Sequence, residues 1–141
     1  MASQTYADFT RSLIEDFRAH NGRTTSGPFV NSDVLLIHTT GAKSGQEHVT
    51  PVVFSRDGDR LVIVASKGGA PTQPAWFHNL VANPMVTVEA GGESFRARAT
   101  VADAAERDRL YARHAAKYPG FLDYQKKTDR VIPVVLLDRE G

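Results

Sequence analysis

No cysteine occurs among the 141 residues of the chain. This absence excludes a disulfide framework, cysteine-ligated zinc or iron–sulfur centres, and a catalytic thiol. A strong charge of one sign is missing as well, because 17 lysine and arginine residues stand against 16 aspartate and glutamate residues. We therefore expect no nucleic-acid partner, and any anion site must be a local one.

Segments that would place the chain in a membrane, or send it across one, are also scarce. The strongest apolar runs, such as residues 61–65, are far too short to span a bilayer. Residues 1–10 are polar and lack the basic flank and apolar stretch of a signal peptide. We therefore expect a cytoplasmic protein. The length and the hydrophobic content of 41% are typical of one globular domain over residues 1–141.

Motifs of protein-only catalysis are absent too. The five histidines form no H-x-x-x-H or H-E-x-x-H pattern, so we expect no metal site and place them at the surface or at helix ends. No G-x-S-x-G element is present, although a Ser–His–Asp triad assembled in space stays open. A chain without evident catalytic groups indicates a borrowed cofactor.

The N-terminal part, residues 1–21, predicts an amphipathic helix over residues 5–19 that ends at Asn21-Gly22. Packing on the protein's own domain is the favoured role of its apolar face. The alternatives are a cap on a binding pocket and a weak membrane contact. The mixed charges of the polar face argue against strong binding to anionic lipid. The apolar face consists of Tyr6, Phe9, Leu13, Ile14 and Phe17.

Six β-type runs follow along the sequence. Asp57-Gly58 and Gly91-Gly92 lie between apolar runs and predict tight hairpins. The runs over residues 85–90 and 93–101 alternate between apolar and polar side chains, with Val101 as the last apolar position, which indicates that each strand has one buried face. The last run is almost continuously apolar, which indicates a strand that is buried on both faces. The pattern predicts a mainly β, α+β fold, an antiparallel barrel of about six strands with appended helices. The runs are residues 34–39, 47–55, 61–66, 85–90, 93–101 and 131–137.

Three helical segments interrupt these strands. Residues 74–82 predict a short helix that begins at a proline. Asp103 and Glu106 resemble a capping box, in which each residue bonds the backbone of the other, at the start of a helix to about residue 117. A third, short helical piece follows Pro119-Gly120 and carries Phe121, Tyr124 and Gln125.

Two loops have the composition of anion-binding turns. In residues 40–45 (Thr-Gly-Ala-Lys-Ser-Gly) two glycines allow successive amides to converge, and Lys43 and Ser44 add a charge and a hydroxyl. Residues 66–69 (Ser-Lys-Gly-Gly) follow directly after a predicted strand. Each loop alone is more typical of an ordinary surface turn, and Trp76 alone is more typical of a core anchor.

Taken together and in order, these elements resemble a known family. Residues 35–46 (Leu-Leu-Ile-His-Thr-Thr-Gly-Ala-Lys-Ser-Gly-Gln), 65–69, 74–84 and 128–134 are similar to motifs of the deazaflavin (F420)-dependent nitroreductase family. This family is part of the split β-barrel flavin and deazaflavin oxidoreductase superfamily. The resemblance covers residues 30–138 and implies that they form a split β-barrel that binds coenzyme F420 and supports hydride transfer.

The resemblance also implies which residues meet the cofactor. Thr50 and Pro51 match strand positions beside the ring system, and Trp76 and Asn79 match cofactor-side positions on the short helix. Two loops would contact the phosphate and deazaflavin region, through Lys43, Ser44 and Gly45 and through Ser66, Lys67 and Gly68.

Two positions depart from the family pattern. Ala42 and His48 stand where the family often has a basic residue, and loss of a fixed positive charge would weaken binding of the anionic cofactor tail. Each missing surface contact should cost about 1 kcal/mol or less. We expect a basic rim to compensate, formed by Lys43, Lys67, Arg56 and Arg60.

The implied reaction is hydride transfer from reduced F420 to an electron-poor acceptor, such as a quinone, a nitroaromatic or a conjugated carbonyl. The protein would orient the reactants and exclude water. Ser66 and Tyr124 are the candidate catalytic residues, because a hydroxyl can supply the proton that the product needs. The apolar wall against the ring would consist of Pro51, Val53 and Ala65.

The candidate substrate pocket consists of Tyr118, Phe121 and Tyr124. These side chains recur every three residues, which places them along one side of a helical turn. By resemblance this segment covers the substrate side of the ring, and sealing of the barrel end is the equal alternative.

Other functions stay open at this point. An FMN-binding split-barrel oxidoreductase would use the same loop chemistry. A non-catalytic carrier of F420 would need the same residues, because the chemistry belongs to the cofactor. A hydrolase would act without any cofactor. The expected partner is a small-molecule electron acceptor, and the oligomeric state is open.

Overall fold

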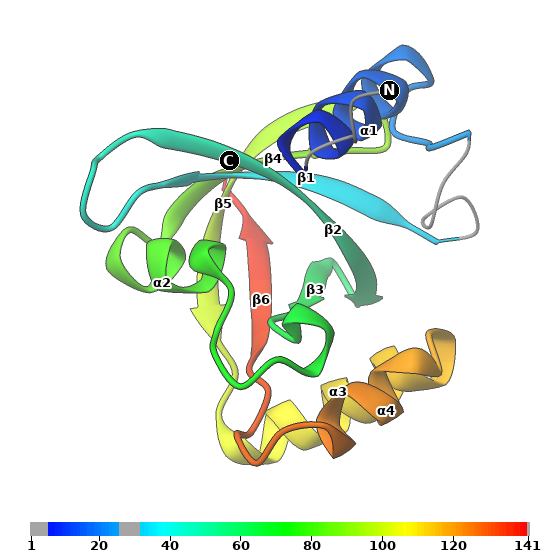
Figure 1. The fold of residues 1–141 in the computed structure, drawn as a ribbon, viewed down its shortest axis with the longest axis vertical. Helices are drawn as coiled ribbons and strands as arrows, with labels where there is room; N and C mark the ends of the chain where they lie inside the picture. The colour runs from blue at the N-terminus through cyan, green and yellow to red at the C-terminus, as the bar shows by residue number, and fades with distance from the viewer. Residues whose placement is uncertain (1–5, 26–31, 141) are drawn as a thin grey trace.

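The computed structural model of the chain describes residues 6–25 and 32–140, without the side chains of Tyr6 and Ala7 and without the surroundings of Gly68. In this part of the chain, six antiparallel strands form a closed barrel in the order β1-β2-β3-β6-β5-β4 (Figure 1). The predicted fold class is confirmed. The strands are β1 (Val34–Thr40), β2 (Glu47–Asp57), β3 (Arg60–Val64), β4 (Met85–Ala90), β5 (Glu93–Val101) and β6 (Val134–Arg139).

Local turns and long-range pairing build the barrel together. Gly58 has φ +60° between β2 and β3, and Gly91 and Gly92 have φ +59° and +83° between β4 and β5. These left-handed conformations favour glycine, so both predicted hairpins are confirmed. The barrel closes where β1 pairs with β4, through Ile37 opposite Val88. Both of these side chains are fully buried in the core.

Two predictions for the strands are wrong at their edges. β6 begins at Val134 instead of residue 131, and Val131 is 68% exposed. Pro133 has no amide hydrogen for a ladder, and its carbonyl accepts from the amide of Ala65 instead. Val101 was expected to be buried but is 44% exposed, because β5 extends there beyond the end of β4 and pairs with β6 alone.

Helix α1 (Tyr6–Ala19) packs on the outside of the barrel, as expected (Figure 1). Leu13 and Phe17 are buried, and Phe17 packs with Val34 and Leu36 of β1. Arg18 adds a bidentate ion pair with Glu89 of β4, at 2.7 and 3.0 Å. Among the described residues, no helix has the length and apolar character needed to cross a membrane.

Helices α3 (Ala104–Lys117) and α4 (Gly120–Lys126) cover the opposite end of the barrel (Figure 1). Asp103 caps α3, because its carboxylate accepts from the amide of Glu106 at 2.9 Å. The return half of the predicted capping box is wrong. The Glu106 carboxylate accepts instead from the guanidinium of Arg60, at 3.3 Å.

Candidate functional site

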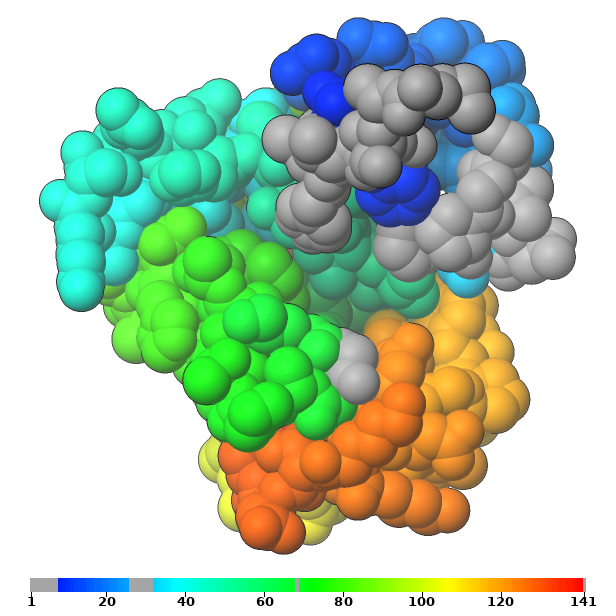
Figure 2. Space-filling model, viewed as in Figure 1, coloured from blue at the N-terminus to red at the C-terminus, as the bar shows by residue number. Residues whose placement is uncertain are grey.

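A groove of about 700 Å³ lies between β2, α4 and the segment that links β3 to α2 (Ala75–Ala82). In Figure 2 it is the recess between the turquoise strand β2, the green segment of α2 and the orange segment of α4. Thr50, Pro51, Val52 and Val53 form its strand wall. The other lining residues among those predicted are Ser66, Lys67, Trp76, Phe121 and Tyr124.

A second pocket of about 410 Å³ continues the groove toward the β1–β2 turn. The two pockets share Thr50, Ala75 and Trp76, so one ligand can occupy both. The extension brings in Lys43, Ser44 and Asn79 of the predicted site, together with Gly41, Ala42, His48 and His78. We call the two pockets together the groove.

The charge of the groove is one-sided. Its described lining contains Lys43, Lys67, His48 and His78 and no aspartate or glutamate. The β2 wall and Trp76 supply an apolar surface between these basic groups. Such a lining favours a ligand that combines a flat apolar body with an anionic group.

The β1–β2 turn is held in place from the side by Asn79 of α2. Asn79 is buried, its amide nitrogen donates to Oγ1 of Thr39 at 3.2 Å, and its oxygen accepts from the amide of Ala42 at 3.0 Å. Gly41 lies at the base of the turn, where a Cβ would lie 2.4 Å from Oγ of Ser44 and would displace that side chain. Asn79 therefore supports the β1–β2 turn and also lines the groove beside it.

The turn is less of an amide cradle than its glycines predict. Gly41 donates to the carbonyl of Gln46 at 2.7 Å, Gly45 donates to the carbonyl of Gly41 at 3.0 Å, and Gln46 donates to Oγ of Ser44 at 3.2 Å. These amides donate to partners within the turn and therefore do not point to a ligand. The groups that face the pocket are the side chains of Lys43 and Ser44, which line it, whereas Gly45 does not.

The second predicted loop forms a 3-10 turn, η1 (Lys67–Gly69), after the buried residue Ser66. Lys67 has φ +48°, a left-handed conformation that is uncommon for a side-chain-bearing residue. The guanidinium of Arg130 donates to backbone carbonyls at both ends of this loop. No role for Arg130 was predicted, although it lies in the family-like segment 128–134, because bonds to backbone carbonyls leave no pattern in the sequence.

The α4 wall contains two of the three predicted substrate residues. The rings of Phe121 and Tyr124 meet edge to face with centroids 5.1 Å apart, and both line the groove. Tyr118 lies elsewhere. Its hydroxyl donates to the carbonyl of Phe54 at 3.0 Å and accepts from the amide of Asp33 at 3.1 Å. Tyr118 therefore fastens α3 to the barrel.

Several other predicted residues also lie outside the groove. Ala65 is fully buried in the barrel core, so it contributes no exposed wall. Arg60 is not part of a basic rim, because it pairs with Asp57 at 2.5 Å at the far end of β2. Arg56 lines a different pocket. Gly68 lies outside the residues whose surroundings the structure describes.

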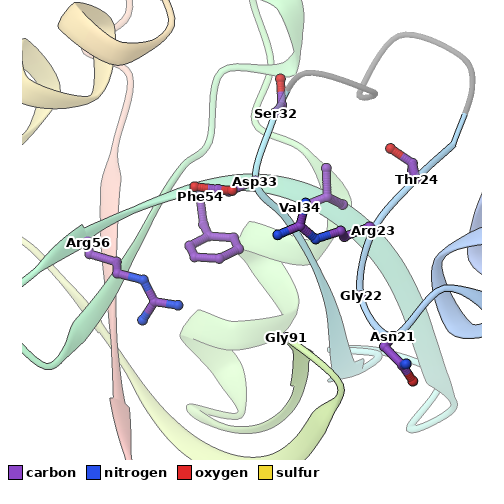
Figure 3. Close-up of a pocket in the computed structure, with 10 residues that line it drawn as sticks. All are labelled: Asn21, Gly22, Arg23, Thr24, Ser32, Asp33, Val34, Phe54, Arg56 and Gly91. Atoms are coloured by element: carbon purple, nitrogen blue, oxygen red, sulfur yellow. The ribbon is translucent and has the colours of Figure 1, made fainter.

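That different pocket, of about 690 Å³, lies beside the C-terminal part of β2 and the start of β1 (Figure 3). Arg23 and Arg56 reach it from opposite sides of Phe54, and Asp33 lies at its edge (Figure 3). None of the predicted cofactor or substrate residues lines it. It is bordered by Thr24 and Ser32, on either side of residues 26–31, which lie outside the described part of the chain.

One histidine departs from the expected surface position. His114 is fully buried on the barrel face of α3, where its Nδ1 lies 2.8 Å from the hydroxyl of Ser55. Its Nε2 has no partner among the described residues, so no carboxylate completes a triad there. Both residues are sealed from solvent, which gives a hydrolase no accessible nucleophile at this pair. Elsewhere in the described chain, no cluster of three histidine or acidic side chains is placed to hold a metal ion.

Comparisons with known proteins give this groove its context. A sequence profile of the F420H2-dependent quinone reductase family matches residues 9–139. An F420H2-dependent quinone reductase of Mycobacterium tuberculosis (strain H37Rv) is 41% identical over 131 residues, which cover 87% of this chain and 85% of that protein. The expected F420-dependent relationship is confirmed, and the match extends over helix α1.

Solved structures agree with this relationship. The structure of an F420H2-dependent reductase, FDR-A, superposes with a TM-score of 0.69 and 37% identity, over 74% of this chain and 93% of that one. A structure described as a domain-swapped dimer superposes with a TM-score of 0.70 and 34% identity, over 95% and 100% of the two chains. The chain therefore belongs to the F420H2-dependent quinone reductase family.

Proposed function

We propose that the protein binds coenzyme F420 in the groove and uses its reduced form to reduce quinone-like acceptors. The observation that carries this proposal is the lining: an apolar strand wall and Trp76 next to lysines, with no acidic side chain in the described surface. A flat deazaflavin ring fits the apolar wall, and the anionic phosphate and tail fit the basic end. The two adjoining pockets, which share Thr50, Ala75 and Trp76, suit a cofactor that carries both parts.

The residues divide into binding and positioning roles. Pro51, Val53 and Trp76 would pack on the ring, while Lys43 and Ser44 would meet the phosphate. Thr50 lies where the two pockets join, between these contacts. Packing on both sides excludes water and fixes the ring's orientation, which is the main contribution a protein makes to cofactor chemistry.

When bound, reduced F420 supplies a hydride from C5 of its deazaflavin ring to the acceptor. The acceptor then needs one proton to become a hydroquinone. Tyr124 and Ser66 line the groove and carry side-chain hydroxyls, and we propose these two residues as proton donors. Phe121 has no hydroxyl and would shape the acceptor space alone.

The first test uses Trp76, the only tryptophan, as a reporter. We expect saturable quenching of its fluorescence when the purified protein is titrated with F420, and little response to FMN, after correction for ligand absorbance. Loss of F420H2 absorbance on addition of a soluble quinone should then follow Michaelis–Menten kinetics. Binding of FMN without binding of F420 would overturn the cofactor assignment. Tight F420 binding without turnover of any quinone would make the protein a carrier.

The proton donors are tested in the same assay. Tyr124→Phe and Ser66→Ala should lower kcat with little change in F420 affinity, because each removes only a hydroxyl. General acid catalysis typically contributes a factor of about 100 or more. Unchanged kcat in both variants would assign the proton to solvent.

A further inference from the structure

Arg130 lies next to the Ser66–Gly69 loop and bonds one carbonyl within it and three acceptors in the residues that flank it. Its Nη2 donates to the carbonyl of Ser66 at 2.7 Å, and its Nε donates to the carbonyl of Ala70 at 2.8 Å. Its Nη1 donates to the carbonyl of Ala65 at 3.1 Å and to Oε1 of Gln73 at 2.8 Å. One planar guanidinium thus spans the end of β3, the 3-10 turn and the segment leading to α2. A lysine ammonium cannot reproduce this fan of fixed donors.

The charge of Arg130 is not neutralised by the protein. All four of its acceptors are uncharged, and it forms no ion pair with a described aspartate or glutamate. The guanidinium is only partly exposed, and this burial lowers the pKa of Arg130 below its ordinary value. The loop is therefore bonded to a guanidinium whose positive charge is not paired with a carboxylate.

The loop is also confined from the α4 side. Gly69 has φ +84°, and a Cβ at this position would lie 2.7 Å from the carbonyl oxygen of Tyr124 and 2.9 Å from Cβ of Lys127. Lys67 keeps its left-handed conformation between these two supports. Unusual backbone conformations of this kind persist only where the surroundings determine them.

We propose that Arg130 is a positioning residue for the cofactor: it locks the Ser66–Gly69 loop into its binding conformation and lends the loop an unneutralised positive charge that favours an anionic group. The locking rests on the geometry alone. The cofactor part rests on the proposed function. Arg130 does not line the groove, so it acts through Ser66 and Lys67, which do.

The locking is tested without any cofactor, by amide hydrogen exchange in Arg130→Gln. The amides of Gly69 and Ala70 donate within the loop, to the carbonyls of Ser66 and Lys67. We expect both to exchange about tenfold faster or more in the variant, while amides of β1 and β4 keep their wild-type rates. Arg130→Lys should give the same faster exchange, and it serves in place of Arg130→Gln if that variant does not fold. Unchanged exchange at both amides would overturn the proposal.

The effect on binding is measured by titration of F420 against Trp76 fluorescence. Affinity should fall in the order wild type, Arg130→Lys, Arg130→Gln, with Kd raised about tenfold or more in the glutamine variant. Wild-type affinity in Arg130→Lys would refute positioning, and equal loss in both variants would refute the charge contribution.

The matched control is Arg113→Gln, which removes an arginine that also donates to a backbone carbonyl, that of Arg56, but away from the groove. The same loss in this control would also refute the proposal. If the wild type binds no F420, the proposed function fails, and the exchange result still decides the locking.

Discussion

The hydroxyl of Ser55 on β2 lies 2.8 Å from Nδ1 of His114 on α3, inside a region that solvent does not reach. Burial, with a smaller contribution from the charge of Lys117, lowers the pKa of His114 to about 4. The imidazole is therefore neutral in the folded protein at pH 7. It helps to hold α3 against the barrel, and its ring meets that of Phe121 edge to face at 4.4 Å.

This histidine makes the folded state sensitive to acid. Because its pKa is lower when folded than when unfolded, the unfolded chain takes up the proton first as the pH falls below about 6.5. The stabilisation is complete above that pH and is lost as the pH falls toward 4. Between pH 7 and pH 5 the free energy of unfolding should drop by about 2 kcal/mol on account of His114 alone. Urea unfolding of the wild type and His114→Gln at pH 7 and pH 5 measures this. Equal losses in the two proteins would show that His114 does not titrate as described.

Asn79 should be needed for the shape of the β1–β2 turn. Asn79→Ala leaves the amide of Ala42 and the hydroxyl of Thr39 without their side-chain partner. A buried group left unpaired costs about 1–3 kcal/mol, so the midpoint of thermal unfolding should fall and F420 affinity should fall with it. Asn83→Ala is the matched control, because exposed Asn83 makes only a 3.4 Å contact to the carbonyl of Thr40. A control as damaging as Asn79→Ala would mean that the turn is held in another way.

The two groove lysines should matter for binding and not for folding. Lys43→Ala and Lys67→Ala should each weaken F420 affinity about fivefold, which corresponds to about 1 kcal/mol for an exposed ionic contact. Unfolding midpoints should stay at the wild-type value. Lys126→Ala removes the same charge from an exposed position on α4 outside the groove lining and should bind normally. Normal binding by both groove variants would mean that neither lysine contacts an anionic group of the cofactor.

Val88 tests the inner face of the barrel. The side chain is fully buried opposite Ile37 and Phe95, so Val88→Asp places a carboxylate in the core with no partner. We expect a loss of several kcal/mol and little folded protein by circular dichroism. Thr87→Asp, on the outer face and opposite Arg96, is the control and should fold. A stable Val88→Asp protein would contradict the register of β4.

Local features of this fold were predictable because they depend on neighbours in the sequence. The hairpin at Gly91-Gly92 and the Asp103 cap need only a turn residue or a carboxylate at a fixed offset. The direction of Tyr118 was not predictable in this way. A spacing of three assumes one continuous helix, whereas α3 ends at Lys117 and a new helix begins at Gly120.

The features that were not predictable from the sequence depend on contacts between distant parts of the chain. The groove depends on β2, α2 and α4 meeting in space, and only the family resemblance placed their residues in one site. Arg130 bonds carbonyls, and carbonyl acceptors leave no trace in side-chain identity. His114 was placed at the surface or at a helix end because it belongs to no histidine motif, although its neighbours Leu110, Tyr111 and Ala115 are buried with it.

The close approach of Gly69 to the backbone of α4 limits how this scaffold can diversify. The proposed acceptor wall on α4 and the proposed coenzyme loop meet at this close contact. New acceptor specificities are therefore most accessible through exchange of α4 side chains such as Phe121. Insertions, deletions or shifts of α4 would also disturb the loop at Gly69, so a change of substrate range by this route would weaken coenzyme binding.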